Sequence, residues 1–271
     1  MIKINDFVVP QTIFPDGSWL LNKVPHTFER FNYTIELEWK YEGEHEVSLL
    51  IYLSKYLCEN YPKTSLTLKM LYVPNARMDR TYNRSEVFTL KYFCDIINSL
   101  NFHNIIVMDV HSNVTSALLN RVSERPLMEL NKLIHQYNNI YFPDEGAQKR
   151  YSKILDLSGK YIYTGMKKRN WGTGAIEGLD VFTSLETPNK SSILMIDDIC
   201  SYGGTFFFSA DKLKKLGFGT IDAYCTHSEA VVNNPESKIQ LAFRNGLINK
   251  LYTTDTLLQK TESEHIIIYH V

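Results

Sequence analysis

Long hydrophobic runs are missing from this chain of 271 residues. No run of about 18 apolar residues occurs, which excludes an ordinary membrane-spanning helix. The first ten residues, MIKINDFVVP, also lack the charged and apolar regions of a signal peptide. We therefore expect a soluble, cytoplasmic protein that does not bind a membrane.

Cysteine is scarce and widely spaced. The four residues are Cys58, Cys94, Cys200 and Cys225, and no two of them form a CxxC pair. This spacing argues against a zinc site and against a disulfide framework. We expect reduced, buried thiols, with Cys200 packed in the core rather than acting as a nucleophile.

An excess of charge of either sign is also missing. The chain has 29 basic and 30 acidic residues and a formal net charge of −1. It therefore has no long-range attraction for nucleic acid, which we do not expect as a partner. Any anionic ligand must be held by a local cluster of groups.

The most informative segment runs from Ser191 to Phe206, SSILMIDDICSYGGTF. Its apolar run predicts a buried parallel strand that ends at Asp197 and Asp198, and its glycine pair predicts a loop that enters a helix. Such a loop can bind phosphate through backbone N–H groups. The two carboxylates would repel that phosphate, but they suit ribose hydroxyls or a hydrated Mg²⁺. The segment predicts a site for a phosphorylated sugar; the alternative is a turn with two solvated aspartates.

The rest of the chain predicts an α/β protein in which short apolar strands alternate with amphipathic helices. We expect helices at 46–60, 85–100, 205–216 and 237–245, with Ser85 as the N-cap of the second. We expect an amino-terminal sheet in residues 1–41 and further strands at 66–73, 104–109, 140–142, 161–166, 220–226, 250–253 and 264–269. Because the pattern restarts after Tyr151, we expect two domains, 1–150 and 151–271.

Charged or polar residues follow several of these strands, at the sheet edge where α/β proteins bind ligands. These segments are NARMDR (75–80), DVHS (109–112), PDEGAQKR (143–150) and KKR (167–169), the last followed by a predicted mobile loop at 171–174. Each has a structural alternative, such as a salt-bridged loop, a structural histidine or a solvated surface. FPDG (14–17) carries a Pro-Asp-Gly turn signal and predicts a hairpin tip.

Taken together and in this order, the segments resemble the motifs of the ribose-phosphate diphosphokinase family, the phosphoribosyl diphosphate synthetases. FPDG is similar to the family's FxDGE, NARMDR to YARQDR, DVHS to DLHS, PDEGAQKR to PDxGxxxR, KKR to KRR, and TDT (254–256) to a carboxy-terminal TdT. The resemblance covers nearly the full chain. It implies two phosphoribosyltransferase-like domains, each a mainly parallel sheet flanked by helices, with the last strand packing back toward the first domain.

The resemblance also implies roles for individual residues. Lys167 and Arg169 are the expected catalytic groups, because they would neutralise charge on the transferred phosphoryl. The expected contacts of ATP are Phe14, Asp16, Arg77, Asp79 and His111, and the expected ligands of Mg²⁺ are His111 and Asp144. The expected contacts of the ribose phosphate are Asp197, Asp198, Ser201, Tyr202, Gly203, Gly204 and Thr205. Because the family's ATP site is shared between subunits, we also expect a homo-oligomer, either a dimer or a hexamer.

The sugar-phosphate loop departs from the family pattern DDxxDTGGT at two positions. Ser201 replaces the third aspartate and Tyr202 replaces the following threonine. The lost carboxylate and the added aromatic ring would admit a 5-phosphate that carries a further group, as in ADP-ribose, with the ring available to stack on a base or cover a diphosphate. Departures at Asn75, Met78 and Ser18 change expected adenine contacts.

The function implied by the resemblance is Mg²⁺-dependent transfer of the diphosphoryl group of ATP to the anomeric hydroxyl of a 5-phosphorylated ribose, with release of AMP. The acceptor is either ribose 5-phosphate or a larger 5′-linked compound such as ADP-ribose. Two alternatives stay open. One is a type I phosphoribosyltransferase, and the other is a non-catalytic regulatory partner of a synthetase.

Overall fold

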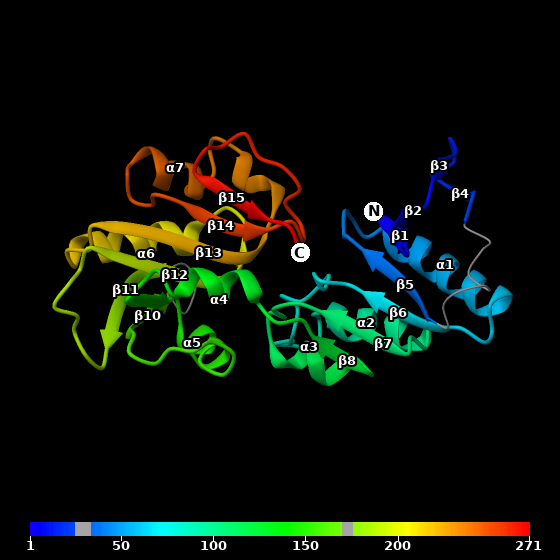
Figure 1. Cartoon of the computed structure of the whole chain (residues 1–271), viewed down its shortest axis with the longest axis horizontal. Helices are drawn as coiled ribbons and strands as arrows, with labels where there is room; N and C mark the ends of the chain where they lie inside the picture. The colour runs from blue at the N-terminus through cyan, green and yellow to red at the C-terminus, as the bar shows by residue number, and fades with distance from the viewer. Residues whose placement is uncertain (25–33, 170–175) are drawn as a thin grey trace. The chain divides into compact units, whose positions relative to one another are not determined.

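The computed structural model describes residues 1–24, 34–169 and 176–271, with the side chains of 167–169 and 176–178 outside the described part (Figure 1). The chain divides into two compact units, Met1–Arg125 and Pro126–Val271, and each is described by itself. This division comes earlier than the boundary expected near residue 150. The physical reason is that the strand at Asn139–Phe142 is hydrogen-bonded between two strands of the second sheet, and alternation in the sequence does not tell which sheet a strand joins.

The first unit contains a six-stranded sheet with the strand order β2-β1-β5-β6-β7-β8. The neighbouring strands from β5 to β8 are parallel, whereas β1 is antiparallel to both of its neighbours. A separate hairpin consists of β3 (Gln11–Ile13) and β4 (Trp19–Leu21). The bounds of the sheet strands are β1 (Ile2–Ile4), β2 (Phe7–Val8), β5 (Thr34–Trp39), β6 (Ser65–Lys69), β7 (Asn104–Val107) and β8 (Val122–Glu124).

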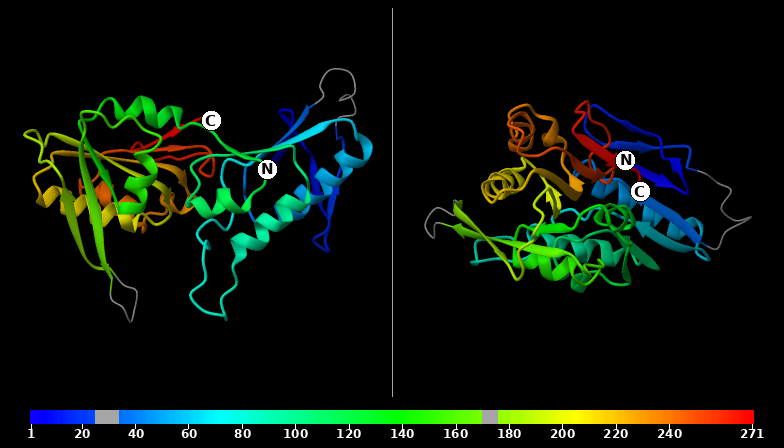
Figure 2. Two further views of the ribbon diagram at one scale, coloured as in Figure 1. Left: turned by 90° about the horizontal axis from the view of Figure 1, so that it is seen from below. Right: turned by 60° about the vertical axis from the view of Figure 1, so that its left-hand side comes forward.

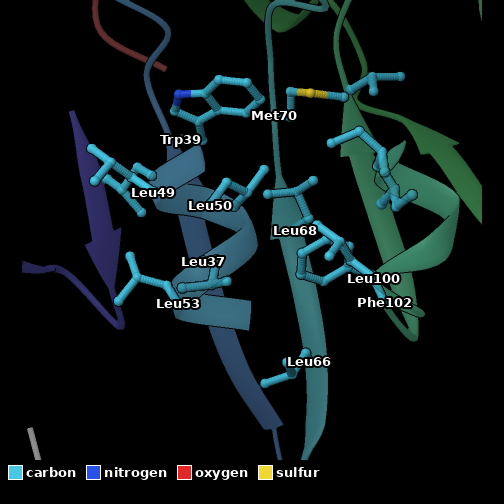
Figure 3. Close-up of a cluster of buried hydrophobic side chains, with 14 of the residues drawn as sticks. Leu37, Trp39, Leu49, Leu50, Leu53, Leu66, Leu68, Met70, Leu100 and Phe102 are labelled. Atoms are coloured by element: carbon cyan, nitrogen blue, oxygen red, sulfur yellow. The ribbon is translucent and has the colours of Figure 1, made fainter. Parts of the chain in front are cut away.

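Helices α1 (Glu46–Asn60), α2 (Thr89–Ser99) and α3 (Asn113–Leu118) belong to this unit. Helix α1 has the bounds predicted from its apolar spacing. Its buried Leu50 and Leu53 pack with Leu37 and Leu68 of the sheet, as Figure 3 shows. Burial of each leucine side chain contributes roughly 1.5–3 kcal/mol, so this contact is a principal part of the unit's core.

Helix α2 begins four residues later than predicted, at Thr89 rather than Ser85. The Ser85 N–H and hydroxyl both donate to the side-chain oxygen of Asn83. Such a local side-chain bond competes with helix formation, so the predicted N-cap at Ser85 is wrong.

The other face of the first sheet is polar. Glu38 on β5 accepts hydrogen bonds from Lys3 on β1 at 3.3 Å and from Lys69 on β6 at 2.7 Å. Burial acts to raise the pKa of Glu38, but the two lysines outweigh it and hold that pKa below its usual range. The ionised carboxylate of Glu38 therefore links β5 to β1 and to β6 through side-chain ion pairs.

The second unit contains a seven-stranded sheet with the strand order β11-β10-β9-β12-β13-β14-β15. Its neighbouring strands are parallel except for β10 and β11, which Figure 2 shows as a long ribbon projecting from the sheet. The expected mainly parallel sheet is confirmed. The bounds are β9 (Asn139–Phe142), β10 (Tyr161–Arg169), β11 (Ile176–Thr183), β12 (Ser192–Cys200), β13 (Thr220–Ser228), β14 (Leu251–Thr254) and β15 (Ile266–Tyr269).

The helices of the second unit are α4 (Met128–Ile134), α5 (Glu145–Tyr151), α6 (Gly204–Lys215) and α7 (Lys238–Arg244). Adjacent residues of β9 show that α5 and α6 lie on opposite faces of the sheet. The Tyr141 hydroxyl lies 2.9 Å from Oγ of Ser209 on α6, whereas the Phe142 ring stacks on Tyr151 of α5, with 5.9 Å between ring centroids. Within the described ranges, no helix is long and apolar enough to span a membrane.

The last strand belongs to the second sheet. β15 pairs in parallel with β14 over four residues, from Leu251–Ile266 to Thr254–Tyr269. Ile266 is buried and Ile268 packs against the core of the second unit. This apolar edge accounts for the pairing with β14, and the expectation that the last strand packs on the first domain stays a prediction.

Candidate active site

The loop between β12 and α6 has the form predicted from its glycines. Gly203, with φ +79° and ψ 16°, adopts a left-handed conformation directly before α6. A Cβ added there would lie 2.6 Å from the Cβ of Ile239, so a larger residue fits neither the φ angle nor the space. The Ile239 N–H also donates to the Tyr202 carbonyl at 3.1 Å. The start of α7 thus holds the loop next to the N-terminus of α6, where backbone N–H groups bind phosphate.

The adjacent carboxylates Asp197 and Asp198 have different surroundings. Asp198 is buried, with 4% of its surface exposed, and its Oδ1 lies 3.1 Å from Nη2 of Arg150 on α5. The Arg150 guanidinium also lies over the Tyr151 ring, 4.8 Å from the centroid. Asp197 is half-buried, and its Oδ1 accepts the Asp198 N–H at 3.0 Å. The ion pair with Arg150 was not predicted, because the two residues are far apart in the sequence.

Asp144 is the N-cap of α5. Its Oδ1 accepts the Ala147 N–H at 3.0 Å, and the residue is exposed. The glycine in this segment therefore stands inside the first turn of a helix. Because β9 and β12 are parallel neighbours, Asp144, just after β9, and the two carboxylates near the end of β12 lie toward the same edge of the second sheet.

A buried tyrosine on β9, Tyr141, lies near enough to two of these carboxylates to sense their charge. Burial raises the pKa of Tyr141 to about 12, and the negative charges of Asp144 and Asp197 add to this increase. Gly165 on β10 accommodates the ring, because a Cβ there would clash with the Tyr141 hydroxyl and lie 2.7 Å from the Pro143 carbonyl oxygen. This tyrosine and its glycine were missed, since neither stands in a recognisable motif.

The predicted catalytic residues lie in β10. The backbone of Lys167 pairs with Leu179, and that of Arg169 pairs with Ile176 after a register shift at 168/169. The KKR segment therefore belongs to the strand, which extends past the predicted end at Met166. The side chains of 167–169 and the predicted loop at 171–174 lie outside the described residues, so the catalytic role of Lys167 and Arg169 stays a prediction.

The TDT segment packs against the carboxyl end of β13. Thr254 and Thr256 donate their hydroxyls to the Thr226 carbonyl at 2.7 and 3.2 Å. The buried His227 ring, which was not predicted as a site residue, places Nδ1 2.8 Å from Oγ1 of Thr256. This network joins TDT to a strand that is the direct neighbour of β12.

The predicted packing role of Cys200 agrees with its surroundings. Contact with Cys225 and burial raise the pKa of the Cys200 thiol, which disfavours the nucleophilic thiolate. Cys94, Cys200 and Cys225 are buried, but Cys58 is exposed. The expectation of buried thiols is therefore wrong for Cys58.

In the first unit, the predicted ATP-binding segments follow the parallel neighbours β6 and β7 and so lie at one sheet edge. Asp79 is buried and accepts from Nε of Arg80 at 3.0 Å, and its contact with ATP stays a prediction. Arg77 is exposed and His111 is half-buried. The structure thus brings the NARMDR and DVHS segments to the same end of the sheet.

FPDG forms the tip of the β3–β4 hairpin, as predicted from its turn signal. The Asp16 carboxylate accepts the Ser18 N–H at 2.9 Å and the Ser18 hydroxyl at 2.6 Å. These two bonds lower the pKa of Asp16. Phe14 beside it has 45% of its surface exposed, so the tip presents an ionised carboxylate and an apolar ring.

The described residues contain no group of three or more His, Cys, Asp or Glu that could hold a metal ion by themselves. A hollow of about 340 Å³ opens in the first unit, but none of the predicted site residues lines it. Apart from Phe14 and Asp16 on the β3–β4 hairpin, the predicted residues belong to segments at the carboxyl ends of strands in the two sheets. The lining residues of the hollow are Glu36, Lys69, Ile106, Ser123, Glu124 and Arg125.

No family model matches the sequence. The chain is 26% identical over 207 residues to a ribose-phosphate pyrophosphokinase of Marinomonas sp., which covers 72% of this chain and 61% of the relative. It is 27% identical over 214 residues to the enzyme of that name from Thermoplasma acidophilum, covering 77% of this chain and 70% of the relative. The phosphoribosylpyrophosphate synthetase of Mycobacterium smegmatis has a similar structure, with a TM-score of 0.73 and 15% identity over 97% of this chain and 86% of that one.

The fold and the β12–α6 site define an α/β protein of the phosphoribosyltransferase-like class. In sequence, the chain is similar to ribose-phosphate pyrophosphokinases at 26–27% identity, and in fold it is similar to a phosphoribosylpyrophosphate synthetase. The match spans about three fifths of the length of the Marinomonas relative.

Proposed function

We propose that this protein transfers the diphosphoryl group of ATP to the anomeric hydroxyl of a 5-phosphorylated ribose and releases AMP. The observation that carries the proposal is the β12–α6 loop, in which a left-handed glycine precedes a helix N-terminus beside two carboxylates. The names of the sequence relatives support the same reaction.

In this proposal the 5-phosphate binds the backbone of residues 201–205, and the acidic pair faces the sugar hydroxyls. A phosphate needs N–H donors, and a hydroxyl needs an acceptor that its proton can reach. The loop supplies the N–H donors, and the carboxylates at the end of β12 supply the acceptors. This division explains why two carboxylates can stand beside an anion site.

Lys167 and Arg169 are proposed to neutralise the charge that spreads over the phosphoryl oxygens during transfer. Arg169 would bind two oxygens with its planar guanidinium, and Lys167 would act as a point charge. The position of the residues along β10 fits this proposal, because the strand pairs with β9 as far as Phe142 and then continues past the end of β9, which Asp144 follows.

ATP is proposed to bind Arg77, Asp79 and His111, together with Phe14 and Asp16 of another subunit. The hairpin that carries Phe14 exposes apolar side chains, with Ile13 60% and Leu20 42% exposed. Such a surface is suited to contact with a second copy of the chain. We therefore propose a homo-oligomer, a dimer or a hexamer, in which each ATP site is shared.

Mg²⁺ is the proposed cofactor, with Asp144 and His111 as the groups that would hold it. Mg²⁺ commonly uses one or two protein groups and completes its shell with water and substrate phosphates. The exposed carboxylate of Asp144 fits that mode of binding, which requires no cluster of three protein ligands. When bound, the ion would neutralise phosphate charge.

Two acceptors are proposed for the sugar site, ribose 5-phosphate and a larger compound such as ADP-ribose. The ring of Tyr202 is 60% exposed beside the phosphate loop. An exposed aromatic ring can stack on a base or cover a diphosphate, whereas a threonine cannot. The larger acceptor is therefore the second candidate.

Two other functions compete with this proposal. A type I phosphoribosyltransferase would use the same sugar-phosphate loop without the ATP segments of the first unit. A non-catalytic regulatory partner would have no need of the KKR segment, the histidine of DVHS and Asp144 together.

The experiment that separates them mixes the protein and Mg²⁺ either with ATP and each candidate acceptor or with phosphoribosyl diphosphate and a free nucleobase, and identifies the products by mass spectrometry. We expect an acceptor that gains two phosphoryl groups. A protein that instead joins a free base to a phosphoribosyl diphosphate would be a phosphoribosyltransferase, and one that turns over none of these substrates would be a silent partner. Asp197→Asn, which removes a sugar-binding carboxylate, is the matched inactive variant.

A further inference from the structure

The hollow of about 340 Å³ in the first unit opens on the polar face of the first sheet. Glu36 of β5, Lys69 of β6 and Ile106 of β7 line it. Their sequence neighbours Leu37 and Leu68 are buried in the core with α1, and successive strand residues alternate between the two faces of a sheet. The three lining residues therefore stand on the face opposite α1, outside every segment that the proposed function uses.

The hollow also reaches the edge of the sheet, where Ser123, Glu124 and Arg125 line it. β8 ends at Glu124, so Arg125 is the first residue after that strand. Since β6 and β7 lie between β5 and β8, the backbones of β5 and β8 are separated by three strand spacings, roughly 14 Å. Glu36 and Arg125 thus stand at two ends of the hollow, with Ile106 between them.

Two of the four charged groups in the lining have partners in the chain. Lys69 donates to Glu38 at 2.7 Å, and Glu124 accepts the Ser116 hydroxyl at 2.8 Å. The lining as a whole has no net charge, because it holds two carboxylates and two cations. It therefore favours a ligand that is neutral overall over one with a large charge of either sign.

Glu36 and Arg125 are the other two charged groups. Both residues are half-buried, and among the described residues neither side chain has a hydrogen-bond or ion-pair partner. A charged group that leaves water without a partner loses solvation free energy. A ligand that meets Glu36 with a cation and Arg125 with an anion would offset that loss at both ends.

We propose that the hollow binds a small linear zwitterion, an aliphatic ω-amino acid whose ammonium pairs with Glu36 and whose carboxylate pairs with Arg125. A guanidinium suits a carboxylate, because it donates two parallel N–H bonds to the two oxygens. The methylene chain between the charges would lie against Ile106 and remove apolar surface from water. A simple anion such as phosphate would satisfy Arg125, but it would leave Glu36 without a partner and add a like charge beside it.

The test titrates the full chain with three compounds of the same chain length and measures their affinities by calorimetry. 5-Aminopentanoate carries both charges, pentanoate lacks the ammonium, and pentylamine lacks the carboxylate. We expect 5-aminopentanoate to bind at least about tenfold more tightly than either of the others, because it makes charge-assisted hydrogen bonds at both ends.

Two variants assign the ends of the ligand. In Arg125→Gln, 5-aminopentanoate should bind no more tightly than pentylamine, because its carboxylate has lost its partner. In Glu36→Gln, it should bind no more tightly than pentanoate, because its ammonium has lost its partner. Glu59→Gln is the matched control, since Glu59 is an exposed carboxylate of α1 in the same unit, and it should bind all three compounds as the wild type does.

Equal affinities of the wild type for the three compounds, or no binding of 5-aminopentanoate, would overturn this inference. Wild-type affinity for 5-aminopentanoate in Glu36→Gln would also overturn it, and so would tighter binding of inorganic phosphate, because the hollow would then be a simple anion site. Urea unfolding shows whether each variant is folded. Where a variant is not folded, the comparison of the three compounds on the wild-type protein decides.

Discussion

At the scale of single residues, the partners of a side chain decide its chemistry. Asp197 and Asp198 are chemically identical neighbours, yet Asp198 is buried beside Arg150 whereas Asp197 is half-buried. Asp79 and Arg80 likewise form a salt bridge, and Arg77 of the same segment is exposed. A motif therefore locates a site, but it does not assign the same role to each of its residues.

The first prediction concerns the two residues expected to neutralise charge in the transition state. Lys167→Ala and Arg169→Ala should each lower kcat by roughly two or more orders of magnitude, as removal of a transition-state charge group does. ATP affinity should stay within several-fold, because the charge they stabilise develops only during transfer. Steady-state kinetics and ATP titrations measure both quantities.

Lys215→Ala is the control for this pair, since Lys215 is 69% exposed and pairs with Asp211 on the surface of α6. Its kcat should equal that of the wild type. Near wild-type kcat in either of the two variants would show that the KKR segment is not catalytic.

The second prediction concerns the residues that distinguish this sugar-phosphate loop. The double substitution Ser201→Asp with Tyr202→Thr should shift kcat/KM toward ribose 5-phosphate by about tenfold or more, on the scale of one charged contact worth roughly 1.4 kcal/mol. The exposed Tyr202 ring would no longer be available to a larger acceptor. An unchanged ratio of kcat/KM for the two acceptors would show that these residues do not select the acceptor.

Residues within motifs could be predicted from the sequence, whereas their long-range partners could not. The phosphate loop, the Asp144 segment and the FPDG turn depend on local geometry, which short sequence patterns encode. Arg150 finds Asp198 and Tyr141 fits over Gly165 only after β9, β10 and β12 have paired. Such contacts depend on strand order, which a single sequence does not specify.

At the scale of elements, apolar spacing predicted the positions of helices and strands in the sequence more reliably than their exact ends or the neighbours with which strands pair. The bounds of α1 agree with its apolar repeat, since its buried leucines face one side of the sheet. The start of α2 was predicted incorrectly, because a local Asn83–Ser85 bond competes with the helix there. The pairing of β15 with β14 was not specified by the sequence pattern. The side-chain pattern of a strand does not name its neighbour.

The third prediction concerns the turn from β12 into α6. Gly203→Ala should destabilise the protein by roughly 1–3 kcal/mol, because alanine is strained at φ +79° and its Cβ would collide with Ile239. Gly204→Ala is the matched control, since a Cβ there meets nothing within 4 Å and alanine favours the helix. Urea unfolding should show a lower free energy of unfolding for Gly203→Ala than for the wild type, and an equal or higher one for Gly204→Ala. Equal stability would contradict the account of this turn.

At the scale of the whole molecule, the two units supply different halves of the proposed reaction. The first unit carries the segments expected to bind ATP, and the second carries the sugar-phosphate loop and the KKR strand. Neither half alone accounts for diphosphoryl transfer. The division between the units at 125/126 places Asp144 and Arg150 in the same compact unit as the β12–α6 loop, so the proposed acceptor site lies within one unit.

The central claim is that a diphosphoryl group, and not a single phosphoryl group, leaves ATP. The most direct measurement is the nucleotide product of a reaction with ATP, Mg²⁺ and ribose 5-phosphate or ADP-ribose, quantified together with the sugar product. The account predicts AMP in a one-to-one ratio with a sugar that carries a diphosphate at the anomeric carbon. Formation of ADP with an acceptor that has gained a single phosphate, or no nucleotide turnover with either acceptor, would contradict it.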